Sequence, residues 1–120
     1  MSPLRAGALL RHFCHCLLLM LALVGASRGV AAHAVLVAST PADGAALAAS
    51  PSEIRLTFNE PVAPITIKVL DGAGTPIAGI NVEAVDRTVT LHLGGELAAG
   101  TYVVSYRVTS QDAHAVTGSI

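Results

Sequence analysis

Hydrophobic and polar residues alternate with a period of two through much of the chain after residue 33. The pattern is clearest over residues 53–60, where Ile54, Leu56 and Phe58 are separated by polar residues. Strict alternation of this kind indicates a β-strand with one buried face. The other segments that we predict as strands are 34–39, 66–70, 79–85, 88–93 and 101–110.

Residue pairs that favour turns lie between these segments, for example Asp43-Gly44, Asp71-Gly72 and Gly94-Gly95. No window has the periodicity of an amphipathic helix of normal length. Short strands joined by turns predict an all-β fold, an antiparallel Greek-key Ig-like β-sandwich of about seven strands. Gly100-Thr101-Tyr102 resembles the tyrosine corner of such sandwiches, and a simply buried tyrosine is the alternative.

The start of the chain has the organisation of a secretory signal peptide. Arg5 and Arg11 give a basic beginning, and residues 13–24 form a short apolar run. Small residues follow and end in Val30-Ala31-Ala32, which suits a signal peptidase. The apolar run is short for a membrane span, which needs about 20 residues.

We therefore predict a signal peptide over residues 1–32 and a mature domain over residues 33–120. Cleavage after Ala32 is favoured over neighbouring positions such as Ala26 or Ala31, and an uncleaved N-terminal anchor is the alternative. Export would place the domain in the periplasm, or make it an extracytoplasmic domain of a membrane protein.

This division changes the composition of the domain. Both cysteines (Cys14 and Cys16) and both methionines (Met1 and Met20) lie before residue 33, so the mature domain has no thiol and no disulfide. It keeps four of the seven basic residues and all eight acidic residues, a formal charge of −4 with histidine neutral. Such a chain offers no electrostatic surface for nucleic acid and suits a cation better than an anion.

Three histidines remain after residue 32, at positions 33, 92 and 114. His92 falls on the outward face of its strand, where we expect a solvated surface residue. His33 becomes the N-terminal residue if cleavage follows Ala32, and its α-amine and imidazole Nδ1 can then close one chelate ring. Nitrogen and oxygen donors in a tetragonal arrangement suit copper(II).

Asp112 and His114 supply a second candidate element. In extended chain, residues two apart point to the same side, so the two side chains can face one point. Alone, this spacing is common by chance and is more typical of a polar loop than of a metal site. With His33 it gives three nitrogens and one oxygen, a set without sulfur that argues against copper(I) and structural zinc.

Six stretches of the sequence resemble one known family: His33-Ala34-Val35-Leu36, Ser39-Thr40-Pro41-Ala42-Asp43-Gly44, Leu56-Thr57-Phe58-Asn59-Glu60-Pro61-Val62, Gly100-Thr101-Tyr102, Tyr106-Arg107-Val108 and Ser110-Gln111-Asp112-Ala113-His114-Ala115-Val116-Thr117-Gly118. In these stretches the sequence resembles the CopC family of periplasmic copper-binding proteins, small β-sandwiches linked to copper resistance. The resemblance implies copper(II) ligands at His33 (amine and imidazole), Asp112 and His114. It also implies that Glu60 is an axial oxygen or a hydrogen-bond acceptor near the metal, and a solvated glutamate at the end of a strand is the alternative.

Two departures from the family pattern matter. Some relatives bind copper(I) through a methionine-rich loop, and the absence of methionine after residue 32 predicts no such site. Relatives also continue the last strand for several residues beyond the position of Gly118-Ser119-Ile120. This difference leaves three alternatives open: a complete chain, a fragment whose last strand is truncated, and the front of a CopC–CopD fusion.

We expect a monomeric copper(II)-binding protein that sequesters or carries copper and passes it to an inner-membrane transporter of the CopD type. We expect no catalysis. The alternatives are a copper-free Ig-like module, and a small copper monooxygenase with an N-terminal histidine brace. The second suits the sequence poorly, because the chain has no tryptophan and its two tyrosines share an apolar face.

Overall fold

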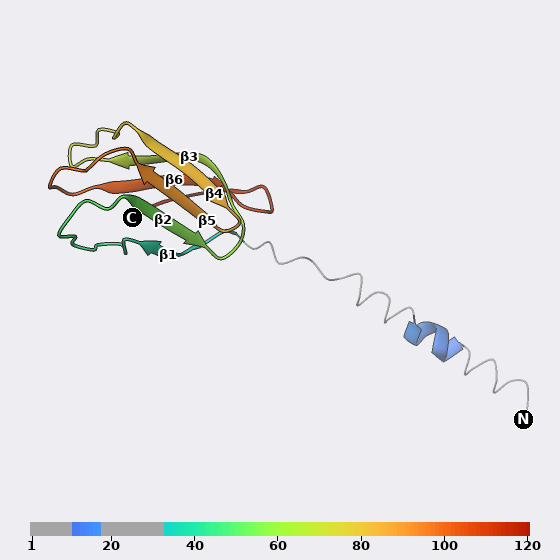
Figure 1. Ribbon diagram of the computed structural model, residues 1–120. Coiled ribbons are helices and arrows are strands. Elements are labelled where there is room, and N and C mark those ends of the chain that lie inside the picture. The colour runs from blue at the N-terminus through green and yellow to red at the C-terminus, as the bar shows by residue number, and fades with distance from the viewer. Residues whose placement is uncertain (1–10, 18–32) are drawn as a thin grey trace, which may run out of the picture. The chain divides into compact units, whose positions relative to one another are not determined.

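The computed structural model describes residues 11–17 and 33–120 of the chain (Figure 1). Residues 11–17 are helical. Most of the predicted signal peptide, including the cleavage site, lies outside the described residues, so cleavage stays a prediction. Among the described residues, no helix is long and apolar enough to cross a membrane.

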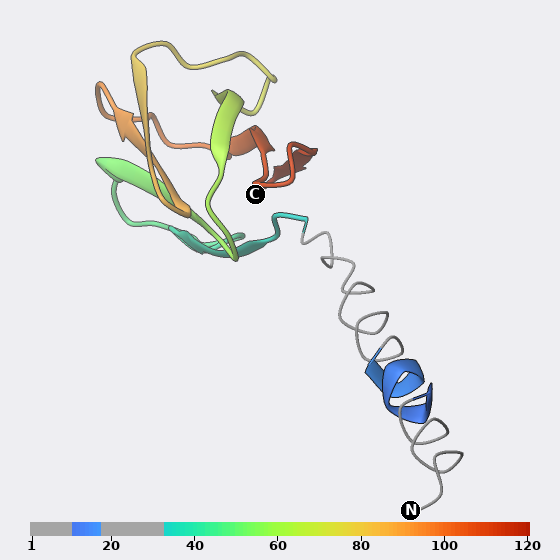
Figure 2. The ribbon, with the colours of Figure 1, turned by 90° about the vertical axis from the view of Figure 1, so that its right-hand side faces the viewer.

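Residues 33–120 form two facing antiparallel sheets, which Figures 1 and 2 show as two layers. One sheet has the strand order β1-β2-β5-β4 and the other β3-β6-β7. This confirms the prediction of an all-β sandwich with seven strands. The strands are β1 (Leu36–Thr40), β2 (Glu53–Phe58), β3 (Ala63–Leu70), β4 (Ile80–Val85), β5 (Thr88–Leu93), β6 (Val103–Thr109) and β7 (Ala115–Ser119).

The core forms where the alternating residues of the two sheets meet. Leu56 and Phe58 of β2 are fully buried, and so is Leu91 of β5. The ring of Phe58 contacts the ring of Tyr106 from the opposite sheet edge-to-face, with centroids 5.5 Å apart. Each such side chain contributes about 1.5–3 kcal/mol when it leaves water, so the alternation seen in the sequence is what holds the layers together.

The strand boundaries differ from the predicted ones where local chemistry interrupts the pattern. β3 begins at Ala63 rather than at Thr66, and its pairing with β6 is irregular between Pro64 and Thr66. A proline has no N–H for the ladder, so it is tolerated only at such an irregularity on an edge strand. β7 was expected only from the family resemblance, as the last strand, because its small and polar residues carry little alternation of their own.

Tyr102 lies just before β6 and makes the hydrogen bond of a tyrosine corner. Its hydroxyl donates to the carbonyl oxygen of Ala98, four residues upstream, at 2.8 Å. A corner of this kind ties the loop before β6 to the start of the strand. It therefore helps to fix β6, whose far end leads into the candidate site.

Candidate metal centre

His33 lies where the chain enters the sandwich, immediately before a residue that is part of the core. Ala34 is only 2% exposed, whereas the His33 side chain is 64% exposed. The buried methyl group of Ala34 therefore holds the backbone against the core while the imidazole stays accessible. β1 begins at Leu36, two residues after Ala34.

Asp112 and His114 come from the loop that joins β6 to β7. The Ser110 N–H donates to the His114 carbonyl oxygen at 2.9 Å, and the Ala113 N–H donates to the Ser110 carbonyl oxygen at 3.0 Å. Ala113 has a φ of 64°, in the left-handed region. The two side chains thus approach each other through a tight turn, and the extended conformation that the sequence suggested for this segment is wrong.

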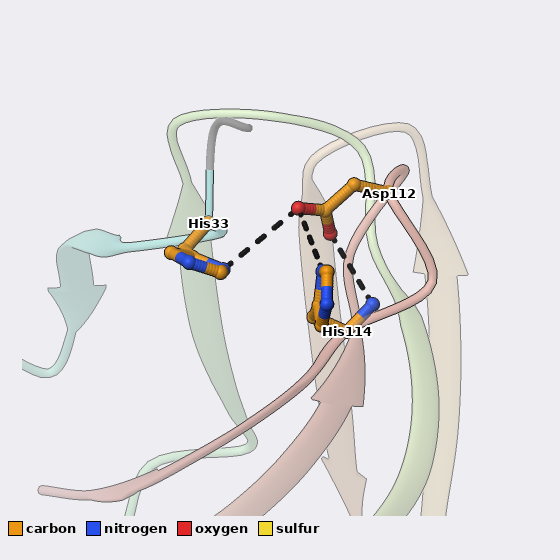
Figure 3. A group of neighbouring side chains, drawn as sticks. All are labelled: His33, Asp112 and His114. Atoms are coloured by element: carbon orange, nitrogen blue, oxygen red, sulfur yellow. Dashed lines mark hydrogen bonds and ion pairs between the residues drawn. The ribbon is translucent and has the colours of Figure 1, made fainter. Parts of the chain in front are cut away.

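The two carboxylate oxygens of Asp112 have different roles. Oδ1 accepts a short hydrogen bond from the hydroxyl of Ser110 and a longer one, 3.2 Å, from the His114 N–H. Oδ2 lies 2.9 Å from His114 Nδ1 and 3.8 Å from His33 Nδ1, as Figure 3 shows. Oδ2 is buried without a well-aligned hydrogen bond. A buried oxygen of this kind, flanked by two imidazoles, is a natural place for a cation.

The three residues bring one donor atom each into a small volume. These atoms all lie within 4.8 Å of one another, and the two imidazole rings meet edge-on with centroids 5.3 Å apart. The side chains of His33 and His114 are more than 60% exposed, and that of Asp112 is 23% exposed. The group is therefore open to an incoming ion.

The surroundings of Asp112 keep it ionised. Hydrogen bonds from the Ser110 hydroxyl and from His114 hold the pKa of the Asp112 carboxyl well below its usual range, and they outweigh the opposing effect of desolvation. A carboxylate that stays charged needs no proton loss before it can bind a metal. Two imidazoles and one carboxylate, without a thiolate, form a donor set that suits divalent transition metals such as copper, iron or zinc.

Glu60 and His92 do not join this group. Oε1 of Glu60 is buried and receives no hydrogen bond, so it remains a candidate acceptor near the β2–β3 connection. His92 lies on the outer face of β5 between two carboxylates, with Glu53 Oε2 at 3.8 Å and Glu83 Oε2 at 3.4 Å. Its side chain is 44% exposed, as expected for a surface histidine.

Two further residues support the site and were not singled out in the sequence. Ser110, only 5% exposed, contacts both Asp112 and the His114 carbonyl oxygen through its hydroxyl. Asn59 hydrogen-bonds to the chain next to His33. In the sequence, the supporting role of Ser110 is suggested only by its position two residues before Asp112. Nothing in the local sequence shows that Asn59 would bond to Val35.

The fold and this group of donors define a small β-sandwich domain with a candidate metal centre shared between its two sheets. A family model for the CopC domain matches residues 36–120, and the chain belongs to the CopC family. This confirms the family resemblance of the sequence. The matched span includes Asp112 and His114 and begins three residues after His33.

Two curated relatives are each named copper resistance protein C. The protein from Pseudomonas syringae pv. tomato is 33% identical, over 74% of this chain and 78% of its own length. The protein from Xanthomonas campestris pv. juglandis is 32% identical, over 79% of this chain and 82% of its own length. Membership of this family supports a copper-related function.

Solved structures share the fold. CopC from Methylosinus trichosporium OB3b has a TM-score of 0.64 and 38% identity, over 72% of this chain and 88% of that chain. PcoC from Escherichia coli, described as a methionine rich copper resistance protein, has a TM-score of 0.56 and 26% identity, over 73% and 94% of the two chains.

Proposed function

We propose that this protein is a periplasmic copper(II)-binding protein that sequesters or carries copper and passes it to an inner-membrane transporter of the CopD type. The observation that carries the proposal is the approach of His33 and His114 to the buried Oδ2 of Asp112. The family and the names of the curated relatives support copper as the metal.

Removal of a signal peptide after Ala32 completes the site. Within the precursor, His33 offers one imidazole, whereas at a free N-terminus it offers an imidazole and an amine. Together with Asp112 and His114 this gives three nitrogens and one oxygen, a donor set suited to copper(II). Glu60 is a candidate for a further oxygen, as an axial donor or as an acceptor behind the ligands.

The exposure of the two imidazoles suits a protein that gives its metal away. Ligands at the surface allow an acceptor to bind the ion before the first ligands have left it, so copper need not pass through water. PcoC is described as methionine rich, but residues 33–120 contain no methionine. We therefore propose a site for copper(II) alone, in a monomer that binds the metal and catalyses no reaction.

The test begins with the N-terminus of the exported protein, which mass spectrometry identifies. The processed protein that starts at His33 is then titrated with copper(II) against a competing chelator. We expect one tightly bound equivalent, and a loss of more than about tenfold in affinity when the α-amine of His33 is acetylated. Unchanged affinity in the acetylated protein would exclude the amine as a ligand.

A pair of histidine variants separates the site from the rest of the domain. His114→Ala removes a proposed ligand and should abolish tight binding, whereas His92→Ala changes a surface histidine on β5 and should leave binding intact. Equal loss in both variants would argue against the proposed centre. Sugar cleavage by the copper-loaded protein, dependent on oxygen, would instead support the monooxygenase alternative.

A further inference from the structure

The segment that carries His33 is held by a residue just after β2, the strand that pairs with β1. This residue, Asn59, contacts Val35 through both its backbone and its side chain. Its N–H donates to the Val35 carbonyl oxygen at 3.0 Å, and its Oδ1 accepts from the Val35 N–H at 2.7 Å. Both polar backbone groups of Val35 are therefore satisfied by one residue.

This contact continues the β1–β2 ladder beyond its regular end. The last pair at this end is Leu36 with Phe58, which follows an irregularity of the ladder between Leu36 and Ala38. Beyond this pair, the side-chain oxygen of Asn59 takes the place of a backbone carbonyl. A chain terminus is poorly ordered unless something ties it down. Val35 is two residues from His33, so the tie lies within about 7 Å of the histidine along the chain.

The segment that carries Asn59 is itself fixed by the β4–β5 turn. The Phe58 N–H donates to the Arg87 carbonyl oxygen at 2.8 Å, and the Val62 N–H donates to the Asp86 carbonyl oxygen at 3.2 Å. These bonds lie on both sides of Asn59. The residue that holds the terminus is therefore mounted on a rigid support, as a precise ligand site requires.

We propose that Asn59 is a positioning residue for the metal centre, which holds the N-terminal arm so that His33 faces Asp112 and His114. This inference rests on the proposed copper site and deepens it. Asn59 touches neither the metal nor its ligands. It acts by restricting the arm before the ion arrives, which lowers the entropy that binding would otherwise lose.

The test compares Asn59→Ala and Asn59→Asp in the processed protein. The alanine variant loses the acceptor for the Val35 N–H, while the aspartate variant keeps an oxygen at the same place. Loss of one hydrogen bond predicts copper(II) affinity about five- to tenfold weaker for Asn59→Ala, and affinity within about threefold of the parent for Asn59→Asp. Asn81→Ala, on the outer face of β4, is the matched control and should bind as the parent does.

Two readouts distinguish positioning from a general loss of structure. In the metal-free protein, Asn59→Ala should speed hydrogen exchange at the Val35 amide while the amides of β5 exchange as before. When the α-amine of His33 is acetylated, the arm no longer offers this nitrogen as a donor, so Asn59→Ala should weaken binding by less than about twofold.

The outcomes separate this inference from the proposed function. If the processed parent binds no copper(II) tightly, the proposed function fails first. If the parent binds tightly and Asn59→Ala binds equally well, the positioning role alone is wrong. The role is also wrong if Asn59→Ala weakens binding in the acetylated protein as much as it weakens binding in the processed one.

Discussion

Asp112 shows how a single charge couples the candidate site to the stability of the domain. Its carboxyl pKa is lowered, chiefly by the hydrogen bond from Ser110 and then by His114. A group whose pKa is lower in the folded state stabilises the fold above its unfolded-state pKa, and this contribution disappears as the pH falls through the folded-state value. The contribution of Asp112 to the stability of the folded domain therefore changes only at acidic pH.

We expect the metal-free protein to lose thermal stability as the pH falls below about 4, and Asp112→Asn to lose less over the same interval. The measurement is the melting temperature of both proteins between neutral and strongly acidic pH. Asp43→Asn, in the loop after β1, serves as the control and should follow the parent. A parallel fall in the parent and in Asp112→Asn would show that Asp112 has no such role.

Ala113 occupies a backbone conformation that favours glycine. Its φ of 64° costs an L-residue about 1 kcal/mol, because the Cβ crowds the following carbonyl oxygen. We expect Ala113→Gly to raise the free energy of unfolding by about 0.5–1 kcal/mol, and the β-branched Ala113→Val to lower it. Urea denaturation of the metal-free proteins measures both, and a less stable glycine variant would contradict this account.

At the scale of elements, the β3–β4 and β5–β6 connections meet at a close backbone contact. The Gly94 N–H donates to the Gly79 carbonyl oxygen at 3.0 Å, and a Cβ at Gly94 would lie 2.6 Å from that oxygen. The adjacent Gly95 has open space at the corresponding position. Alanine substitutions at these two neighbouring glycines therefore compare a crowded position with an open one.

Gly94→Ala should lower the free energy of unfolding by about 1–3 kcal/mol, because the new methyl group must push two backbone segments apart. Gly95→Ala should change it by less than about 0.5 kcal/mol. Chemical denaturation of the two variants gives the comparison directly. Equal effects would mean that the two connections move apart without cost.

The elements that the sequence predicted best are those with one buried face. β2 and β5 alternate strictly, and their bounds were predicted within two residues. The pattern of residues alone did not predict β7, which was expected only from the family resemblance. Its residues are small or polar, and Gly118 lies against the ring of its cross-strand partner Tyr106, a contact with no local signal. The turn around Ala113 was not predicted either, because alanine has no preference for positive φ and so gives no sequence signal for such a turn.

At the scale of the whole molecule, the candidate centre joins two sheets. His33 precedes β1 of one sheet, and Asp112 and His114 follow β6 of the other (Figure 3). The sequence predicted these three residues from the cleavage pattern and from spacing, but their proximity depends on sandwich packing that no local pattern encodes. A metal that binds all three therefore acts as a cross-link between the layers.

This cross-link predicts that copper(II) stabilises the folded protein. Binding to the folded state alone adds about 2.7 kcal/mol when the free ion is about 100 times above its dissociation constant. For a domain of this size the melting temperature should rise by about 10–20 °C. A chelator should reverse the rise, and His114→Ala should not show it. When the α-amine of His33 is acetylated, the same copper(II) concentration should give a clearly smaller rise, because the amine is no longer a donor. A rise of equal size in the processed and acetylated proteins would mean that the ion joins the sheets through side chains alone, and that the free amine created by export processing contributes nothing to the cross-link.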